Sequence, residues 1–417
     1  MERMCGRRRR VCSRHLTIAS ARAGLLVCGL WAAGGGAAGA QTSGPAVEGA
    51  VVDAWARCEN RGGALAPDAW IAGCTAIIDA ALADPATTRE PNLPVAYVNR
   101  GNAHARLGAH AAAIADYDAA IALNPAYASA FNSRGAAYAA LRDFERAITN
   151  FTQAIALDPL FANALGNRGN AYRETGDAPR ALADLDRALA LRPHPIDYNN
   201  RGIAHLMADD ADRAIADFDA ALALDGAYAT ARFNRGLAHA RRDAHAAAIA
   251  DFDAVLALAP DHAGALMHRG RTYEALADFT RALGDYEAYV ALRPEDAHGL
   301  HHRCAARGAL GRRLDLALAD CDAALARAPS PDILETRGLV QLRRGAFERA
   351  LADFSAACAE TPPRASAQYG RGVARLRLGA AAEGAADVAE AVARAPDVAR
   401  RFAAFGVAAP AMPPAQP

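Results

Sequence analysis

An Arg-Gly pair returns along this chain at an almost constant interval, and this period constrains the fold more than any other feature. The steps between successive pairs are 34 residues, except for a single step of 33. The nine second positions are Gly101, Gly135, Gly169, Gly202, Gly236, Gly270, Cys304, Gly338 and Gly372. A fixed period of this size is typical of a solenoid of stacked repeats, in which each repeat contacts only its neighbours. We therefore expect one elongated array rather than the two or three globular domains that a length of 417 residues would suggest.

Each period has the pattern of two short helices. In the first period, Tyr97, Gly101 and His104 recur at helical spacing and a break follows at 107–109. The second half has the same spacing and ends at Pro125, which lacks the N–H needed to continue a helix. The sequence therefore predicts a helix-turn-helix unit in every period.

On these residues the chain resembles the tetratricopeptide repeat family. The Arg-Gly glycine matches the small residue of the family's first helix, and the second helix supplies a small residue followed four positions later by a large one, such as Ala113 and Tyr117. The resemblance covers residues 94–396. It implies an all-α fold, a right-handed superhelical solenoid with a C-terminal capping helix. The seventh repeat departs from the pattern, with Cys304 for glycine and one inserted residue near Gly311, and so does the ninth, with Gly384 for alanine.

The remaining segments flank this array. Residues 1–40 have the pattern of an export signal, with arginines at 7–10, an apolar stretch at 23–33 and an Ala-Gly-Ala cleavage sequence before Gln41. The signal leaves both the general and the twin-arginine export routes open. Residues 41–93 are expected to form a divergent helical repeat, 94–396 nine tandem repeats, 397–407 a capping helix and 408–417 a disordered Pro/Ala tail.

Two pairs of cysteines occupy equivalent positions in two different repeats. Cys58 and Cys74 align with the positions of Gly101 and the large helix residue after it, and Cys304 and Cys321 do the same in the seventh repeat. In the family these positions face each other across one helix pair. We predict the disulfides Cys58–Cys74 and Cys304–Cys321 in an oxidising compartment, the alternative being buried reduced thiols. Cys358 is interpreted as an unpaired core residue.

A recurrent Asp accompanies the recurrent Arg. It precedes the large residue of the second helix in eight repeats, beginning with Asp116, and Asn150 replaces it in the second repeat. A row of catalytic or ligand-binding charges is one interpretation. Because the pair repeats in nearly every unit, we favour a structural ladder of bidentate Arg–carboxylate contacts.

Histidines cluster in the seventh repeat. His298, His301 and His302 lie at i, i+3 and i+4, a spacing at which histidines bind zinc. No carboxylate stands in an H-E-x-x-H arrangement, and His301 and His302 occupy positions that are polar elsewhere, as at Asn199 and Asn200. A metal-binding protein centred on these histidines is the least favoured of our hypotheses.

The resemblance implies a binding groove. In this family the first helices of the repeats line a concave surface that binds extended peptides or helices of partner proteins. The corresponding residues here are Asn102, Arg106, Asn132, Asn170, Arg173, Asn199 and Arg241. Asn side chains bind peptide backbones and Arg pairs with carboxylates. Asn99 and Asn167 also fall on this surface, but for them exposure to solvent or hydrogen bonding between repeats is at least as good an interpretation.

Composition excludes several other functions. The formal net charge is zero, which gives no support for binding nucleic acid or an anionic membrane. No phosphate loop or nucleophile elbow occurs, so we expect neither an enzyme nor a cofactor. The sequence favours a periplasmic or secreted interaction scaffold that binds a protein or peptide and has no stable membrane span after signal cleavage. An assembly or chaperone factor for an envelope complex is the alternative, and the oligomeric state stays open.

Overall fold

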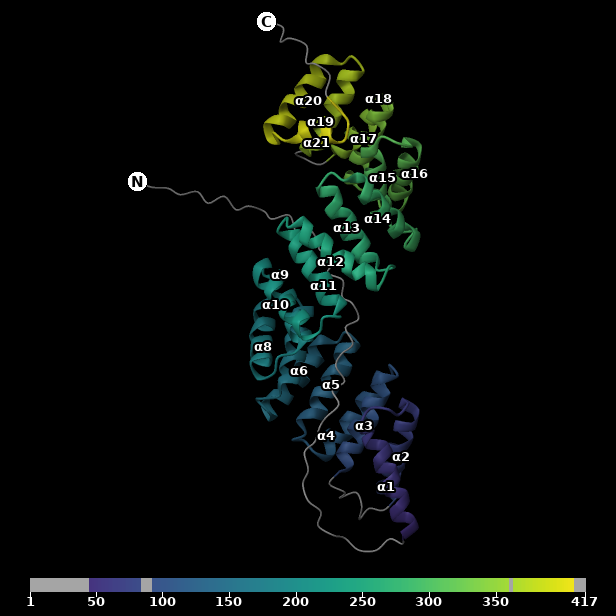
Figure 1. Ribbon diagram of the computed structural model, residues 1–417, viewed down its shortest axis with the longest axis vertical. Coiled ribbons are helices and arrows are strands. Elements are labelled where there is room, and N and C mark those ends of the chain that lie inside the picture. The colour runs from purple at the N-terminus through teal and green to yellow at the C-terminus, as the bar shows by residue number, and fades with distance from the viewer. Residues whose placement is uncertain (1–44, 84–91, 360–362, 409–417) are drawn as a thin grey trace, which may run out of the picture. The chain divides into compact units, whose positions relative to one another are not determined.

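The computed structural model describes residues 45–83, 92–359 and 363–408, which fold into helices and, within these ranges, contain no strand (Figure 1). The all-α prediction is confirmed. The predicted export signal lies outside the described residues, as does the predicted tail beyond Ala408. Among the described residues, no helix is both long and apolar enough to cross a bilayer.

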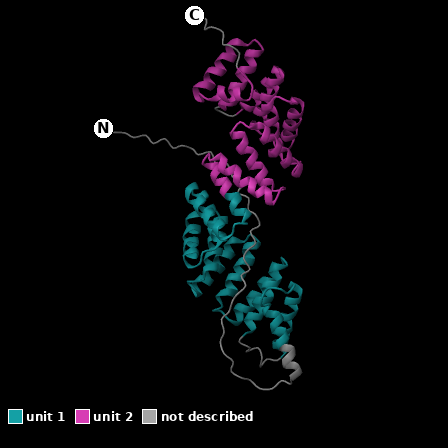
Figure 2. Cartoon of the chain, in the orientation of Figure 1, with its two compact units in different colours: residues 1–234 teal, residues 235–417 magenta. Residues whose placement is uncertain are grey.

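The chain divides into two compact units, residues 1–234 and 235–417 (Figure 2). The boundary falls inside helix α11, a division that the unbroken sequence period does not indicate. The helices that begin in the first unit are α1 (Pro45–Glu59), α2 (Pro67–Ala83), α3 (Leu93–Arg106), α4 (His110–Leu123), α5 (Ala128–Ala140), α6 (Phe144–Leu157), α7 (Ala162–Glu174), α8 (Ala178–Leu191), α9 (Pro195–Met207), α10 (Ala211–Leu224) and α11 (Ala229–Arg241). Those of the second unit are α12 (His245–Leu258), α13 (Ala263–Ala275), α14 (Phe279–Leu292), α15 (Ala297–Leu310), α16 (Leu314–Arg327), α17 (Pro331–Arg344), α18 (Phe347–Ala357), α19 (Ala365–Arg377), α20 (Ala381–Arg394) and α21 (Val398–Ala404).

Successive helices from α3 to α20 form the pairs expected of nine repeats, with α1 and α2 as a further pair before them. Side-chain caps start several second helices: Asp143, Asp177 and Asp210 each accept a hydrogen bond from a backbone N–H in the first turn. Within each unit, first helices of neighbouring repeats also contact each other, as α3, α5, α7 and α9 do, and as α15, α17 and α19 do. We call the surface that these first helices form the helix-A face.

The Arg-Gly glycine allows the two helices of a repeat to cross closely. A Cβ atom added to Gly101 would lie 2.6 Å from Cε1 of Tyr117, and one added to Gly236 would lie 2.8 Å from Cε1 of Phe252. Tyr117 and Phe252 are at most 1% exposed, so their rings could not move aside to make room for a larger residue at the glycine position. The small and large residues of the period are therefore two halves of one packing contact.

Candidate functional site

The recurrent Arg and Asp side chains form a ladder that joins the two helices of a repeat. Arg201 on α9 binds Asp217 on α10 through Nη2 at 2.6 Å and Nε at 3.0 Å. Its Nη1 donates to Asp186 of the preceding repeat at 2.7 Å. Asp217 is buried, at only 4% exposed, whereas Asp186 is exposed. One guanidinium therefore joins both the helices of its own repeat and the repeat before it, which supports the structural interpretation.

The same arrangement recurs along both units. Arg–Asp pairs with hydrogen bonds within a repeat are Arg100–Asp116, Arg168–Asp184, Arg201–Asp217, Arg235–Asp251, Arg269–Asp285, Arg303–Asp320, Arg337–Asp353 and Arg371–Asp387. In the second repeat Arg134 donates through Nε to Oδ1 of Asn150 at 2.7 Å. The ladder therefore belongs to the scaffold, and no single member of it is distinguished as a site.

Both predicted cysteine pairs lie at disulfide distance. The sulfur atoms are 2.06 Å apart in Cys58–Cys74 and in Cys304–Cys321, and all four residues are fully buried. Each pair spans the crossing of the two helices in its repeat, where other repeats have glycine against a large side chain. Cys358 at the end of α18 is half-buried and its thiol is unpaired.

Three of the predicted groove asparagines are used inside the protein. Asn102 is 7% exposed and accepts a hydrogen bond from the Tyr117 hydroxyl at 2.8 Å. Asn132 accepts from Nδ2 of Asn167 at 3.0 Å, and Asn199 accepts from a neighbouring first helix in the same way. Asn199 is only 2% exposed. Asn102 thus joins the two helices of its repeat, and Asn132 and Asn199 join neighbouring first helices, so we remove all three from the proposed partner-binding set.

The partner of Asn199 is Asn234, which donates through Nδ2 at 2.9 Å and is 1% exposed. Asn234 was not among the groove residues predicted from the sequence. Its position 35 residues after Asn199 equals the spacing between Asn132 and Asn167, and this equal spacing was the available signal. The interpretation of Asn167 as a residue that bonds between repeats is confirmed.

The other predicted groove residues keep part of their surface exposed, although only 13% of the Arg173 side chain is exposed. Arg106 is exposed, with its guanidinium 6.0 Å from the centroid of the Trp70 ring. Asn170 and Arg173 are partly exposed on α7, where Nη2 of Arg173 donates to Asn170 at 2.7 Å and to Glu174 at 2.6 Å. Arg241 lies exposed at the end of α11. The structure therefore brings Asn170 and Arg173 together on one helix.

A buried carboxylate near these residues was missed from the sequence. Asp197 in the first turn of α9 is 7% exposed, and its Oδ1 would lie 2.5 Å from a Cβ added to Gly166 of α7. Burial raises the pKa of Asp197 to about 6, against which Arg192 acts weakly. The glycine at 166 provides the space for this carboxylate.

Two histidines of the seventh repeat form hydrogen bonds to the first helices of the neighbouring repeats, α13 and α17. His302 Nδ1 lies 3.1 Å from Oε2 of Glu274, which also accepts from the Tyr286 hydroxyl at 2.6 Å. His301 Nε2 lies 2.8 Å from Oγ1 of Thr336 on α17. Because that hydroxyl donates to a backbone carbonyl of its own helix, we assign His301 Nε2 as the donor in this contact.

Burial and hydrogen bonding shift the pKa values of His301 and Glu274 in this cluster. Burial lowers the pKa of His301 to about 4, and neighbouring His302 and His298 act in the same direction. Burial acts to raise the pKa of Glu274, but the hydrogen bond and charge of His302 outweigh it and lower the pKa. No group of three His, Cys, Asp or Glu residues in the described part of the chain is placed to hold a metal ion.

Several solved structures are similar to this chain. The Cut9–Hcn1 assembly of the APC/C matches with a TM-score of 0.50 and 15% identity over 70% of this chain and 54% of that chain, which shows the fold alone. YrrB, a TPR protein with an unusual peptide-binding site, matches at 23% identity with a TM-score of 0.39 over 44% of this chain and 96% of that chain. PilF of Pseudomonas aeruginosa matches at 18% identity with a TM-score of 0.46 over 50% of this chain and 95% of that chain. No curated protein matches in sequence.

The sequence itself matches a family described as Tetratricopeptide repeat. The matched residues are 94–127, 132–194, 199–263, 245–297, 306–365 and 336–399. Together they cover more than half of the 417 residues. The chain therefore belongs to the tetratricopeptide repeat family.

Proposed function

We propose that this protein is a non-enzymatic scaffold that binds extended peptides or helices of partner proteins on its helix-A face. The observation that carries the proposal is the contact between successive first helices, from α3 to α9 in the first unit and from α15 to α19 in the second, which makes one surface from several repeats within each unit. A partner lying on such a surface touches several repeats at once, and its affinity grows with each contact.

In the first unit, Arg106, Asn170 and Arg173 are the accessible polar side chains that we assign to partner contact. The forked guanidinium of Arg173 suits a carboxylate, and the amide of Asn170 suits a peptide backbone. The hydrogen bonds that join Arg173 to Asn170 and Glu174 hold the guanidinium in place before a partner arrives.

A site-specific photo-cross-linker placed at Asn170 tests this assignment. We expect it to capture a partner protein, whereas the same cross-linker at Arg146 on α6, whose side chain is 67% exposed, should capture none. The combined substitutions Arg106→Ala and Arg173→Ala should abolish capture, with Arg146→Ala as the matched control. Equal capture from Asn170 and Arg146 would place binding on another surface.

We also propose that the mature protein acts in the periplasm or outside the cell. Two buried cysteine pairs at disulfide distance support this location, because disulfides persist in oxidising compartments. N-terminal sequencing of the protein from the envelope fraction should begin at Gln41. Recovery of an uncleaved chain from the cytoplasm would contradict the proposal.

A further inference from the structure

The segment after the last repeat reaches much further than a capping helix needs to. A helix that only covers the end of a repeat array contacts the last repeat, because repeats contact their neighbours alone. Here α21 contacts α19 and α20 of the last repeat, and the residues after it extend back to α17 and α15. The segment 398–408, which we call the C-terminal segment, therefore lies along three first helices.

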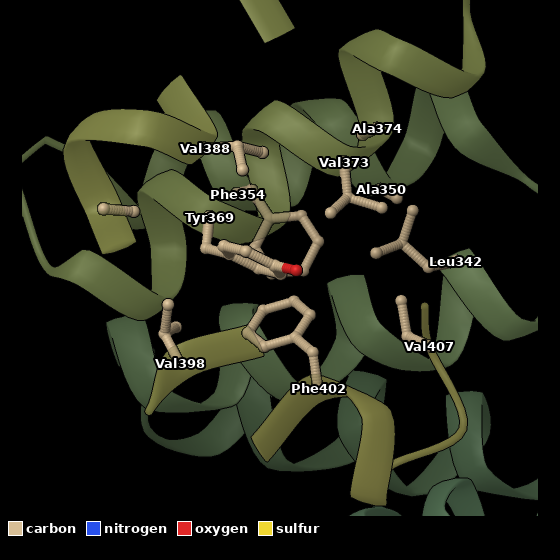
Figure 3. Close-up of a cluster of buried hydrophobic side chains, with 11 residues drawn as sticks. Leu342, Ala350, Phe354, Tyr369, Val373, Ala374, Val388, Val398, Phe402 and Val407 are labelled. Carbon is tan, nitrogen blue, oxygen red and sulfur yellow. The ribbon is translucent and has the colours of Figure 1, made fainter. Parts of the chain in front are cut away.

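The apolar side of the C-terminal segment is buried on the helix-A face (Figure 3). Val398 is fully buried and Phe402 is 4% exposed, with its ring centroid 4.7 Å from that of Tyr369 on α19. Val407 packs in the same cluster as Leu342 of α17 and is 6% exposed. These side chains stabilise the segment chiefly by burial of apolar surface.

The contact with the seventh repeat is made through a glycine. Cζ of Phe405 would lie 2.6 Å from a Cβ added to Gly308 on α15, so the ring rests directly on that backbone. Nη1 of Arg343 on α17 donates to the carbonyl oxygens of Gly308 and Ala309 at 2.6 Å each. The guanidinium of Arg343 also lies against Gly406, where an added Cβ would be 2.8 Å from Cζ.

Space remains beside the segment. A pocket of about 310 Å³ is lined by residues of α17 and α19 and by residues 406–408 of the segment itself. Arg377 on α19 borders it and donates to the carbonyl oxygen of Ala408 at 3.3 Å. The segment therefore does not fill all of the surface beside it.

We propose that the C-terminal segment is an intramolecular ligand of the helix-A face of repeats seven to nine. The partner that replaces it is a short amphipathic helix with a branched apolar residue and two aromatic residues at the spacing of Val398, Phe402 and Phe405. This proposal rests on the proposed function of the helix-A face and specifies the ligand for the second unit. Release of the segment is what opens the surface to the partner.

Competition within one chain gives the expected size of the effect. A segment tethered by a short connection has an effective concentration of about 1 mM. A free segment that binds with a Kd tenfold or more below this concentration is matched by a tethered copy that weakens binding of an added copy at least tenfold.

The test uses the full-length protein and a labelled peptide of residues 397–408. We expect the wild-type protein to bind the peptide at least tenfold more weakly than the variant Phe402→Ala, Phe405→Ala, whose own segment is released. A peptide with the same two substitutions should not bind either protein. Leu258→Ala, at a leucine that is 63% exposed on α12, is the matched control and should behave as the wild type.

A second arm keeps both surfaces unaltered, in case the variant loses helical structure. A protease site inserted between Ala395 and Asp397 of the full-length chain allows the segment to be cut from its tether. After cleavage, native mass spectrometry should show the segment dissociating on dilution, and the labelled peptide should replace it.

Three results would overturn the proposal. They are equal peptide affinity for wild type and folded variant, a cleaved segment that never exchanges, and a dimer formed through the segment of a second copy. Each leaves the cross-linking result at Asn170 in the other unit untouched, so failure here is distinguishable from failure of the proposed function.

Discussion

Replacing Asp217 tests whether the Arg–Asp ladder stabilises the repeats. Asp217 is 4% exposed and accepts hydrogen bonds from Arg201 at 2.6, 3.0 and 3.2 Å. The substitution Asp217→Ala removes all three and leaves the guanidinium to Asp186 of the preceding repeat, whose side chain is 63% exposed. An exposed carboxylate compensates poorly for a buried one, because solvent screens its charge.

The magnitude follows from the burial of the pair. Removing one partner of a buried ion pair costs about 3–5 kcal/mol of unfolding free energy. The side chain of Arg201 keeps 22% exposure, so we expect the lower end, about 3 kcal/mol. Asp217→Asn retains an oxygen acceptor and should cost about 1 kcal/mol. Asn150 in the second repeat already accepts from Arg134 in this way at 2.7 Å.

Urea unfolding followed by circular dichroism measures both variants, with the change in midpoint compared at unchanged slope. The matched comparison is Asn150→Asp, which gives Arg134 a charged partner but removes the hydrogen bond from Asn150 Nδ2 to the Arg146 carbonyl oxygen at 2.8 Å, so the midpoint should change little. A loss below about 1 kcal/mol for Asp217→Ala would show that the ladder does not stabilise the repeat. Equal losses for Asp217→Ala and Asp217→Asn would show that the retained acceptor contributes nothing.

Three further predictions concern buried groups. Cys304→Ser should lower the unfolding free energy by about 3 kcal/mol, the chain-entropy value for a loop of roughly 17 residues, and a reductant should then shift the urea midpoint less than in the wild type. Asp197→Asn should raise stability at pH 7 by on the order of 2 kcal/mol and have little effect at pH 4, because a carboxyl with a pKa raised from 3.8 to about 6 destabilises the fold as pH rises through that window. His301 has a pKa lowered from 6.5 to about 4, so its contribution to stability is complete above pH 6.5 and is lost as pH falls to 4. His301→Gln should flatten the fall in thermal midpoint over that acid range, and an unchanged pH profile would contradict this.

Much of the fold could be predicted because repeats make local contacts. The glycine and the large residue that it contacts are separated by 16 positions, as in Gly101 and Tyr117, so one period of sequence contains both halves of the contact. The Arg and Asp of the ladder have the same separation. Because the same contact recurs in every repeat, the residues that make it recur at a constant interval in the sequence. That interval is what predicts the helix pairs.

The accessible side of the first helices was harder to predict. Asn102 and Arg106 lie one turn apart on α3 and belong to the same sequence stripe, yet one is buried and the other exposed. The hydroxyl of Tyr117 donates to Asn102, whereas Leu185, at the equivalent position of the third repeat, has no hydroxyl to offer Asn170. Whether a polar side chain of a first helix is buried in a hydrogen bond therefore depends on the residue opposite it on the second helix. The helical spacing of the polar residues does not show this.

The contacts of the C-terminal segment were also hard to predict from the sequence, because they join residues that are far apart in the chain. Its apolar spacing predicts a helix with one buried side, and α21 is that helix. The contact of Phe405 with Gly308, however, joins residues almost three periods apart. Gly308 stands where the other repeats have alanine or a larger residue, but nothing in the sequence pairs it with Phe405.

The cysteine pairs explain why two repeats depart from the consensus without losing the helix pair. At the crossing of the two helices, most repeats place a glycine against a large side chain such as Phe252. Cys304 and Cys321 replace both members together, and their sulfur atoms fill the crossing at 2.06 Å from each other. A change at one position alone would leave either a cavity or a clash, because the glycine side has no room for a Cβ beside a ring. The paired change in the seventh repeat, and again at Cys58 and Cys74, is therefore a second solution to the same packing problem.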